Sequence, residues 1–321
     1  MWILYAVISM MLYALAEVLQ KKGSDINEEY SELKLLVWFG IISGFFSFAI
    51  LLLDLKESPA TALQIIANNH AVLLSPALYY LSLLLCFLAF KLVPVSIASP
   101  ITCMEGIFSF IGIIILYSAI GKDNVLAESI TSLKVFIVVL LSVGIYACTL
   151  IQSRKEDKSE NLKLAKEKFF IKSGRFAIIG VAMTLLSAMF DAGSSLTDLY
   201  FLGEMSDSYD YIYTHGMIVL VFSAVLYLIL WLLERKPYNL FKKTELPKIM
   251  GAGFDSLGMV FFMIAAAGNQ IYTNVLISGF CVFTVLLSRL ILKETIEKHQ
   301  AVWIGFTITL IVVFTVVDEM F

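Results

Sequence analysis

Four acidic side chains interrupt the long apolar stretches of this sequence: Glu17, Glu105, Asp191 and Asp255. A carboxylate that faces lipid near the centre of a bilayer costs roughly 3 kcal/mol or more. It must therefore be paired, hydrogen-bonded or protonated, or face a water-filled cavity. The basic residues near these segments are few and lie at helix ends, where long side chains reach the interface. We therefore expect the four acids to line one cavity and to bind protons or cations.

Polar and aromatic side chains accompany these acids. Residues three or four positions apart share a helix face, which places Tyr13 beside Glu17 and extends a polar stripe from Asp191 to Asp198. A purely packing role stays open for Asp198, which lies near a predicted helix end. The remaining candidates for the lining of the substrate and proton site are Tyr79, Tyr272 and Asn274.

Histidine and cysteine give no sign of a catalytic or metal site. His215 follows two tyrosines at the start of an apolar stretch and is expected at the membrane interface. His70 and His299 are expected in loops, and none of the three is chosen as a proton relay. The four cysteines all lie in apolar runs without C-x-x-C spacing, as is typical of small core residues: Cys86, Cys103, Cys148 and Cys281. We predict no cofactor, no metal and no enzymatic activity.

The composition is that of a polytopic membrane protein. Of 321 residues, 60% are hydrophobic and only 15% are charged, whereas about a quarter of all residues are charged in soluble domains. This balance argues against nucleic-acid binding, a soluble catalytic core and disorder. No cationic stretch precedes the first apolar run and no small-residue cleavage site follows it, so we expect a retained helix and not a signal peptide.

Ten apolar stretches are long enough for membrane helices, since a hydrocarbon core of about 30 Å needs about 20 residues. The predicted fold class is an all-α polytopic membrane protein with ten transmembrane helices. Their predicted ranges are 2–20, 35–53, 72–91, 95–117, 132–152, 175–201, 211–233, 248–268, 271–292 and 300–318.

The chain divides into two similar halves. A charged segment at 153–174 separates a first five-helix repeat at 1–152 from a second at 175–321. A shift of 174 residues places Glu17 on Asp191, and the short turns before the fourth and ninth helices also correspond. Because five is odd, duplicated halves must be inverted in the membrane, as in many secondary transporters.

The distribution of Lys and Arg predicts the orientation. Most of these residues lie in the odd-numbered loops and the charged central segment, whereas the even-numbered loops hold only Lys56, Lys122 and Lys134. Positively charged loops stay in the cytoplasm. The bias therefore predicts that both termini lie outside.

Two stretches resemble known families. "LLSRLILKETIEKHQAVWIGFTITLIVV" resembles the end of the second repeat in EamA-like members of the drug/metabolite transporter superfamily, with Glu294, Gln300 and Gly305 at matching positions. The first half lacks the matching Glu, and that family usually has cytoplasmic termini, contrary to the charge bias. "ALAEVLQKKGS" is similar to the first helix of small multidrug resistance proteins. This resemblance implies that Glu17 exchanges protons for organic cations.

The leading hypothesis is a secondary transporter in a bacterial inner or plasma membrane. It would move a small metabolite or organic cation by alternating access, with protons as the coupling ion and the lipid bilayer around it. One alternative is a carrier of divalent cations such as Mg²⁺, which oxygen ligands suit. Others are a non-transporting receptor and an intramembrane aspartyl protease, although "GAGFD" lacks the G-x-G-D spacing of the latter. The direction of transport, the substrate and the oligomeric state stay open.

Overall fold

Helices make up the regular structure of the described residues. The computed structural model describes residues 1–23, 28–53, 59–92, 101–102, 104–121, 130–156, 174–204, 208–240, 242, 245–269, 271–291 and 298–320. Within these ranges no strand occurs, in agreement with the predicted all-α class. The helices are α1 (Trp2–Gly23), α2 (Ser31–Leu53), α3 (Pro59–Asn68), the 3₁₀ helix η1 (His70–Leu73), α4 (Leu74–Leu92), α6 (Glu105–Ala119), α8 (Ser132–Glu156), α10 (Gly174–Glu204), α11 (Ser208–Glu234), α12 (Leu246–Gly268), α13 (Thr273–Ile277), α14 (Phe280–Ile291) and α15 (Lys298–Met320).

Six of the described helices are long and apolar enough to cross a membrane. They are α1, α2, α4 with the preceding η1, α10, α11 and α12. Shorter apolar segments lie in α6, α8, α15 and the α13–α14 pair. Each predicted range therefore contains helix, whereas ten membrane crossings stay a prediction.

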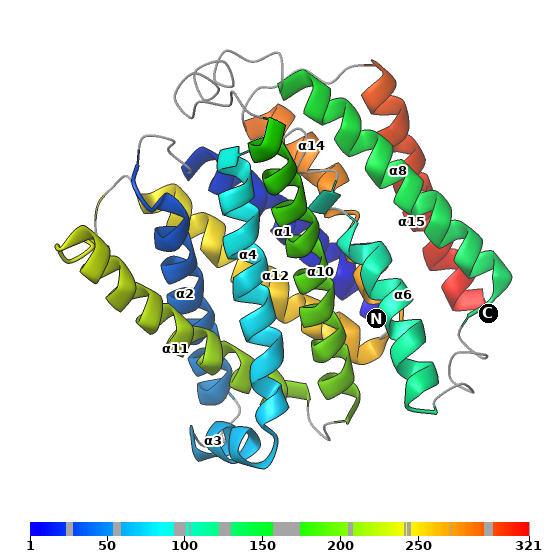
Figure 1. Ribbon diagram of the computed structural model, residues 1–321. Helices are drawn as coiled ribbons and strands as arrows, with labels where there is room; N and C mark the ends of the chain where they lie inside the picture. The colour runs from blue at the N-terminus through cyan, green and yellow to red at the C-terminus, as the bar shows by residue number, and fades with distance from the viewer. Residues whose placement is uncertain are drawn as a thin grey trace.

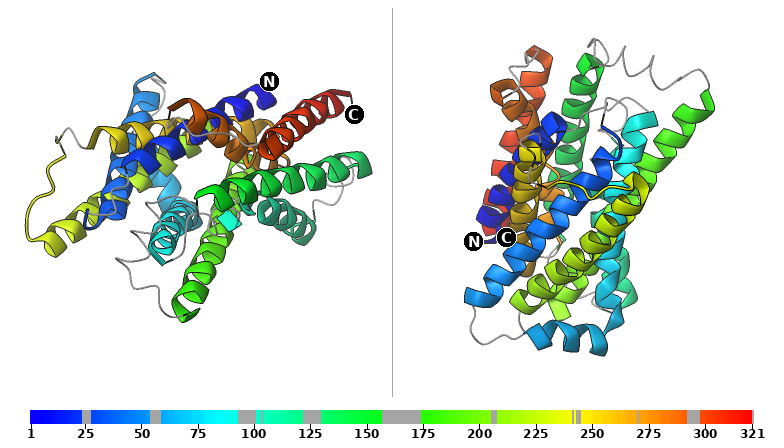
Figure 2. Two further views of the ribbon diagram at one scale, coloured as in Figure 1. Left: turned by 90° about the horizontal axis from the view of Figure 1, so that it is seen from above. Right: turned by 90° about the vertical axis from the view of Figure 1, so that its left-hand side faces the viewer.

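The helices form one bundle in which partners come from distant parts of the chain. α2 packs against α11 at one edge and α8 against α15 at the other, as Figure 1 shows. Between these edges α1 lies against α12 and α14, while α10 lies against α4 and α6. The two labelled termini lie near each other in both views of Figure 2. Each half of the sequence thus packs mainly against the other half.

Small residues allow these helices to approach closely. At the crossing of α2 and α11, a Cβ added to Gly40 would lie 2.7 Å from the carbonyl oxygen of Val219 and 2.2 Å from Cβ of Ser223. Gly44, four residues on, faces α11 in the same way, so the pair forms a G-x-x-x-G contact of the kind common between membrane helices. The hydroxyl of Ser223 donates to the carbonyl of Val37 at 2.7 Å. The close contact therefore also supplies a hydrogen bond between helices.

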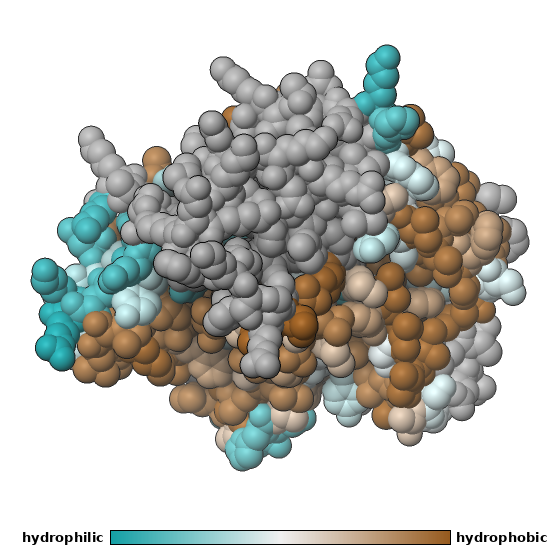
Figure 3. All heavy atoms as spheres, turned by 45° about the horizontal axis from the view of Figure 1, so that its top comes forward, coloured by the Kyte–Doolittle hydropathy of each residue, from teal (hydrophilic) through white to brown (hydrophobic). Residues whose placement is uncertain are grey.

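Large apolar side chains cover the outside of the bundle. On α10, Leu186 and Met189 are 45% and 54% exposed, whereas Thr184 and Ser187 are buried on the opposite face. On the visible described part of Figure 3, brown side chains cover the flanks and teal ones gather at the margins. Apolar side chains outside and polar side chains inside are the reverse of the arrangement in soluble proteins, and a surface that faces lipid requires this arrangement.

The fourth and ninth predicted helices differ from their expected ranges. α6 begins at Glu105, whereas residues 95–100 of the predicted range lie outside the described residues. Glu105 lies in a first helical turn, where free N–H groups favour a carboxylate. The ninth range contains two helices, because the chain turns at Ser278 and Gly279 between α13 and α14. The N–H of Gly279 bonds the carbonyl of Leu276, three residues earlier, which tightens the end of α13.

Other elements also depart from the expected boundaries. The sequence analysis did not foresee α3, which lies across one end of the bundle in Figure 1. α8 continues to Glu156, beyond the expected end of the first repeat at residue 152. The rest of the charged segment, 157–173, lies outside the described residues.

Candidate functional site

Asp255 joins three helices near the middle of the bundle. Its carboxylate is 7% exposed and accepts a hydrogen bond from Nε2 of Gln20 on α1 at 2.9 Å. The hydroxyl of Tyr79 on α4 donates a second one. A buried carboxylate needs such partners, so α12 presents Asp255 to side chains of the first half. Asp255 and Tyr79, both predicted site residues, are therefore in direct contact.

Glu105 lies where α6, α10 and α13 meet. The hydroxyl of Ser195 on α10 donates to its Oε1 at 3.2 Å, and the Asn274 side chain on α13 donates a further hydrogen bond. Nδ2 of Asn274 also donates to Oγ of Ser109 at 2.6 Å. Glu105 and Asn274, both predicted site residues, are therefore in direct contact.

Glu17 faces α14 from α1. The hydroxyl of Thr284 donates to its Oε2 at 2.7 Å. Tyr13, one turn earlier on α1, has its ring 6.1 Å from that of Phe280 on the same helix α14. The broken ninth helix thus touches Glu105 through α13 and Glu17 through α14.

Asp191 links the other acids electrostatically. It interacts with the charges of Glu105, Asp255 and Asp198. The thiol of Cys86 on α4 lies in the field of both Asp191 and Glu17. Tyr13 interacts with Asp191, Asp255 and Glu105 together. Acids from both halves of the chain therefore act on the same part of the bundle.

Five of the predicted site residues are partly exposed. Asp191 is half-buried, although Thr184, Ser187, Ser195 and Asp198 on the same face of α10 are buried. That face is opposite the lipid-facing side chains of α10. Four other predicted site residues share the intermediate exposure: Glu17, Glu105, Tyr13 and Tyr79. For Asp191 the exposed part of the side chain therefore lies on the side of α10 away from the exposed Leu186 and Met189.

Tyr272 packs in a different environment. It is 1% exposed, and its ring stacks on Phe110 with centroids 5.9 Å apart and meets Phe314 edge-on at 5.1 Å. Nζ of Lys134 lies 5.7 Å from the centre of the ring. Its role as a lining residue of the substrate site stays a prediction.

A second polar cluster surrounds Asp198, whose side chain is 1% exposed. Tyr211 donates to Oδ1 at 2.5 Å, and Ser75 donates to the same oxygen. Oγ of Ser75 lies 3.0 Å from Oγ of Ser194. His215, 3% exposed, places Nε2 4.0 Å from Oδ1 of Asp198. His215 is buried in the bundle, because α11 begins at Ser208 and carries the ring among the helices; its position at the membrane interface stays a prediction.

A third cluster, which we name the end cluster, joins the two halves at one end of the bundle. Nζ of Lys34 lies 3.0 Å from Oε1 of Glu28 and 2.8 Å from Oε1 of Glu234. Lys248 contacts Glu28 and lies 3.0 Å from Oε2 of Glu245. In the sequence the Lys residues indicate only an orientation. Their pairing with acids in another half was not visible from the local sequence.

Electrostatics in this end cluster favour the ionised form of Glu28. Burial raises the pKa of Glu28, but hydrogen bonds and charges from Lys248 and Lys34 outweigh burial and lower the pKa from its ordinary 4.5. Tyr238 adds further hydrogen bonds to the cluster, since its hydroxyl donates to Glu245 and accepts from Nε1 of Trp38 at 3.2 Å. The end cluster is thus held by charge and by shared hydrogen bonds.

Some predicted residues lie outside the described part of the chain. They include Glu294 and, for their side chains, Gln300, Lys21 and Lys22. Among the described residues no group of three or more His, Cys, Asp and Glu side chains is placed to hold a metal ion.

Comparisons with known proteins show a likeness in fold. No family model matches this chain and no curated protein matches it. A solved structure described as "Crystal structure of protein" superposes with a TM-score of 0.68, covering 99% of this chain and 98% of that one, at 13% sequence identity. At this identity the likeness shows the fold alone. The shared fold extends over nearly the whole of both chains.

Proposed function

We propose that this chain is a secondary transporter related to the EamA-like branch of the drug/metabolite transporters. It moves a small metabolite or organic cation by alternating access and exchanges it for protons. The observation that carries the proposal is the electrostatic interaction of carboxylates from both halves: Asp191 interacts with Glu105 and Asp255, and Cys86 lies in the field of both Asp191 and Glu17. A transport site between two repeats requires residues of both halves.

The chemistry of the site favours a cationic passenger. The described hydrogen-bond partners of Glu105 and Asp255 are neutral hydroxyl, amide and phenol groups. A neutral shell leaves the negative charges available to an ammonium group or to protons. An anionic substrate would instead need an Arg or Lys clamp beside these residues.

The pattern of helix neighbours supports the proposed duplication. Exchange of the halves turns α1 into α10, α12 into α4, and the α13–α14 pair into α6. The contact of α1 with α12 then becomes that of α10 with α4, and the contact of α1 with α14 becomes that of α10 with α6. The α2–α11 and α8–α15 pairs map onto themselves. Two inverted five-helix repeats account for this symmetry. We place them in a bacterial inner or plasma membrane with both termini outside, as the distribution of Lys and Arg predicts.

Transport by reconstituted protein tests the proposal. Liposomes with trapped pyranine and an imposed pH gradient are exposed to tetraphenylphosphonium, to choline and to Mg²⁺ in separate experiments. We expect an organic cation to discharge the gradient. Glu17→Gln and Asp191→Asn should each lower the coupled proton flux by about tenfold or more, because a neutral amide binds neither proton nor cation.

Glu29→Gln is the matched control, since Glu29 is exposed outside the candidate spans. It makes the same change of acid to amide and should leave the flux unchanged. Unaltered coupling in both Glu17→Gln and Asp191→Asn would refute the proposed mechanism. A flux supported by Mg²⁺ alone would favour the divalent-cation carrier in its place.

A further inference from the structure

Asp198 is an acid that the proposed transport site does not use. Its carboxylate is buried between α4, α10 and α11 and receives hydroxyl donors from Ser75 and Tyr211. Asp191, two turns earlier on α10, interacts with it electrostatically. Asp198 therefore lies between the central acids and the end of the bundle where α10 leads into α11.

The imidazole of His215 is the unsatisfied neighbour of this acid. Its Nε2 is buried and has no hydrogen-bond partner. The distance of 4.0 Å from Nε2 to Oδ1 of Asp198 is too long for a hydrogen bond. A separation of 4.0 Å leaves the two atoms within reach of each other after a small movement of either side chain.

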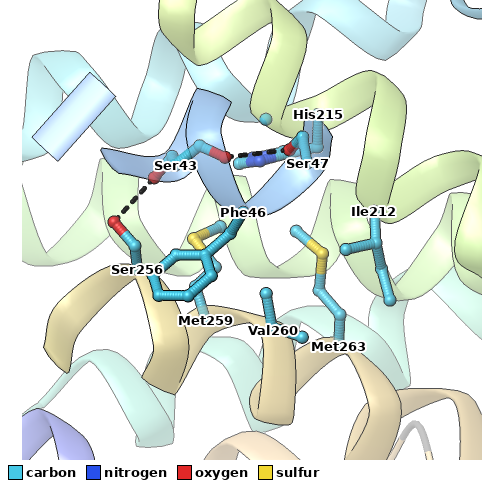
Figure 4. A pocket seen from close by; sticks show the side chains of 10 residues that line it. Ser43, Phe46, Ser47, Ile212, His215, Ser256, Met259, Val260 and Met263 are labelled. Carbon is cyan, nitrogen blue, oxygen red and sulfur yellow. Dashed lines mark hydrogen bonds between the residues drawn. The ribbon is translucent and has the colours of Figure 1, made fainter. Parts of the chain in front are cut away.

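His215 also borders a pocket between α2, α11 and α12. The pocket has about 20 Å³ of space open to the centre of a water molecule, which is enough for one water. Figure 4 shows Ser43, Ser47 and His215 along one side and Met259 and Met263 along the other. The hydroxyl of Ser43 lies 2.8 Å from that of Ser256. The polar wall of the pocket can therefore orient a water beside the imidazole.

We propose that His215 relays protons between a water molecule in this pocket and the carboxylate of Asp198. This relay rests on the proposed proton coupling for its biological purpose. The water transfers a proton to one ring nitrogen, and Nε2 releases a proton to Oδ1 of Asp198. The carboxylate becomes a neutral acid, the imidazole returns to a neutral form, and the water is left as hydroxide that takes up a proton from solution. The reverse sequence unloads Asp198.

The groups around His215 suit a proton path. On α10 the acids Asp198 and Asp191 face this region, and on α11 Tyr211 lies one turn before the ring with centroids 6.2 Å apart. Asp210 occupies the first turn of α11, and the exposed His70 on η1 bonds the carbonyl of Ile66. Neutral hydroxyls also lie in this region: Ser43, Ser47 and Ser256 line the pocket with His215, and Ser75 and Ser194 lie beside Asp198.

Time-resolved infrared spectroscopy of the protein in nanodiscs tests the relay without a transported substrate. A flash releases protons from a caged acid, and the carboxylic C=O band that Asp198→Asn removes reports on Asp198. We expect His215→Gln to slow the rise of this band by about tenfold or more. Imidazole added to His215→Gly should restore the rate, because it can occupy the space of the lost ring.

His70→Gln is the control and should leave the rate unchanged. An unchanged rate in His215→Gln, or no band removed by Asp198→Asn, would overturn the relay.

A measurement on the native site covers the case of a misfolded variant: ¹⁵N-histidine labelling gives signals from three histidines, of which His70→Gln and His299→Gln identify two. Exchange between the two tautomers of His215 supports the relay, and one fixed tautomer from about pH 5 to about pH 8 overturns it. Neither readout depends on transport, so an inactive transporter with a working relay would count against the proposed function alone.

Discussion

Gln20 is one of the two residues that donate hydrogen bonds to the buried Asp255. Its Nε2 donates to the carboxylate at 2.9 Å, and Gln20→Met would keep the length of the side chain while removing this donor. We expect a loss of about 1–3 kcal/mol in the free energy of unfolding, because a buried charged acceptor loses a partner. Unfolding in detergent, followed by circular dichroism, measures the loss.

A double-mutant cycle separates this hydrogen bond from changes in packing. In an Asp255→Asn background the acceptor is neutral, so Gln20→Met should cost clearly less than in the native background. Equal losses in the two backgrounds would show that Gln20 contributes through packing alone.

Thr284 tests whether Glu17 is held as a hydrogen-bonded acid. Thr284→Val removes the hydroxyl that donates to Oε2 at 2.7 Å and, with it, a longer contact of 3.2 Å to the carbonyl of Phe280 on the same helix. The expected loss is about 1–2 kcal/mol, measured by the same unfolding experiment. Thr309→Val is a matched control, since the exposed hydroxyl of Thr309 bonds only the carbonyl of Gly305 on its own helix at 2.8 Å. A comparable loss in both variants would contradict a specific contact with Glu17.

The sequence reveals the acids but not their partners. Glu17 and Asp191 can be found because a charge inside an apolar stretch is conspicuous. Gln20 and Thr284 are ordinary helix residues, and each meets its acid across a separation of more than 200 residues. The burial of His215 was missed for a similar reason, since neighbouring tyrosines suit either an interface or a core.

At the scale of elements, the contact of α6 with the broken ninth helix positions Glu105. A Cβ added to Gly106 would lie 1.9 Å from Oγ and 2.8 Å from Cβ of Ser278. Gly106→Ala should therefore push α6 away from α13 and lower the free energy of unfolding by about 1–3 kcal/mol. Ser278→Gly in the same chain removes both clashing atoms and should recover most of the loss, as thermal unfolding in detergent would show.

Gly253 supplies the control for this prediction. It also lies in a helix, but nothing comes within 4 Å of its added Cβ, so Gly253→Ala should cause no loss. An equal effect of the alanine substitutions at Gly106 and Gly253 would indicate a general response of helical glycines and not a local clash.

Hydrophobic length predicts where helices lie better than where they break. The apolar run from 271 to 292 gives no warning of the turn at Ser278, because Ser and Gly also occur within continuous membrane helices. The short helix α3 was missed because ten residues are too few for the length criterion. For the turn at Ser278, the contacts that favour a break come from neighbouring helices that are distant in the sequence.

At the scale of the whole molecule, the end cluster connects the two halves of the chain, which the proposed alternating-access cycle would separate. Glu28 and Lys34 belong to the first half, whereas Glu234, Glu245 and Lys248 belong to the second. The charge bias predicted that Lys residues gather at this end but could not show that they pair across the halves. The proposed transport cycle requires these ion pairs to break when this end opens.

Glu28→Gln should loosen this end while leaving the rest of the bundle folded. The amide removes the charge that Lys34 and Lys248 share, although Lys248 keeps Glu245 at 3.0 Å, so we expect a loss of about 1–2 kcal/mol and not that of a fully broken buried pair. Trp38, whose Nε1 bonds Tyr238 in the end cluster, reports the change through fluorescence once Trp2, Trp231 and Trp303 are replaced by Phe.

Because the pKa of Glu28 is lowered from 4.5 in the folded protein, the contribution of Glu28 to stability is complete above that value and is lost as the pH falls through the lower, folded-state pKa. Native protein should therefore show the Trp38 change only in acid, whereas Glu28→Gln shows it at neutral pH and the exposed control Glu29→Gln does not. A Trp38 signal that follows neither the acid nor Glu28→Gln would mean that this end is held by apolar packing, and the ion pairs would then not control its opening.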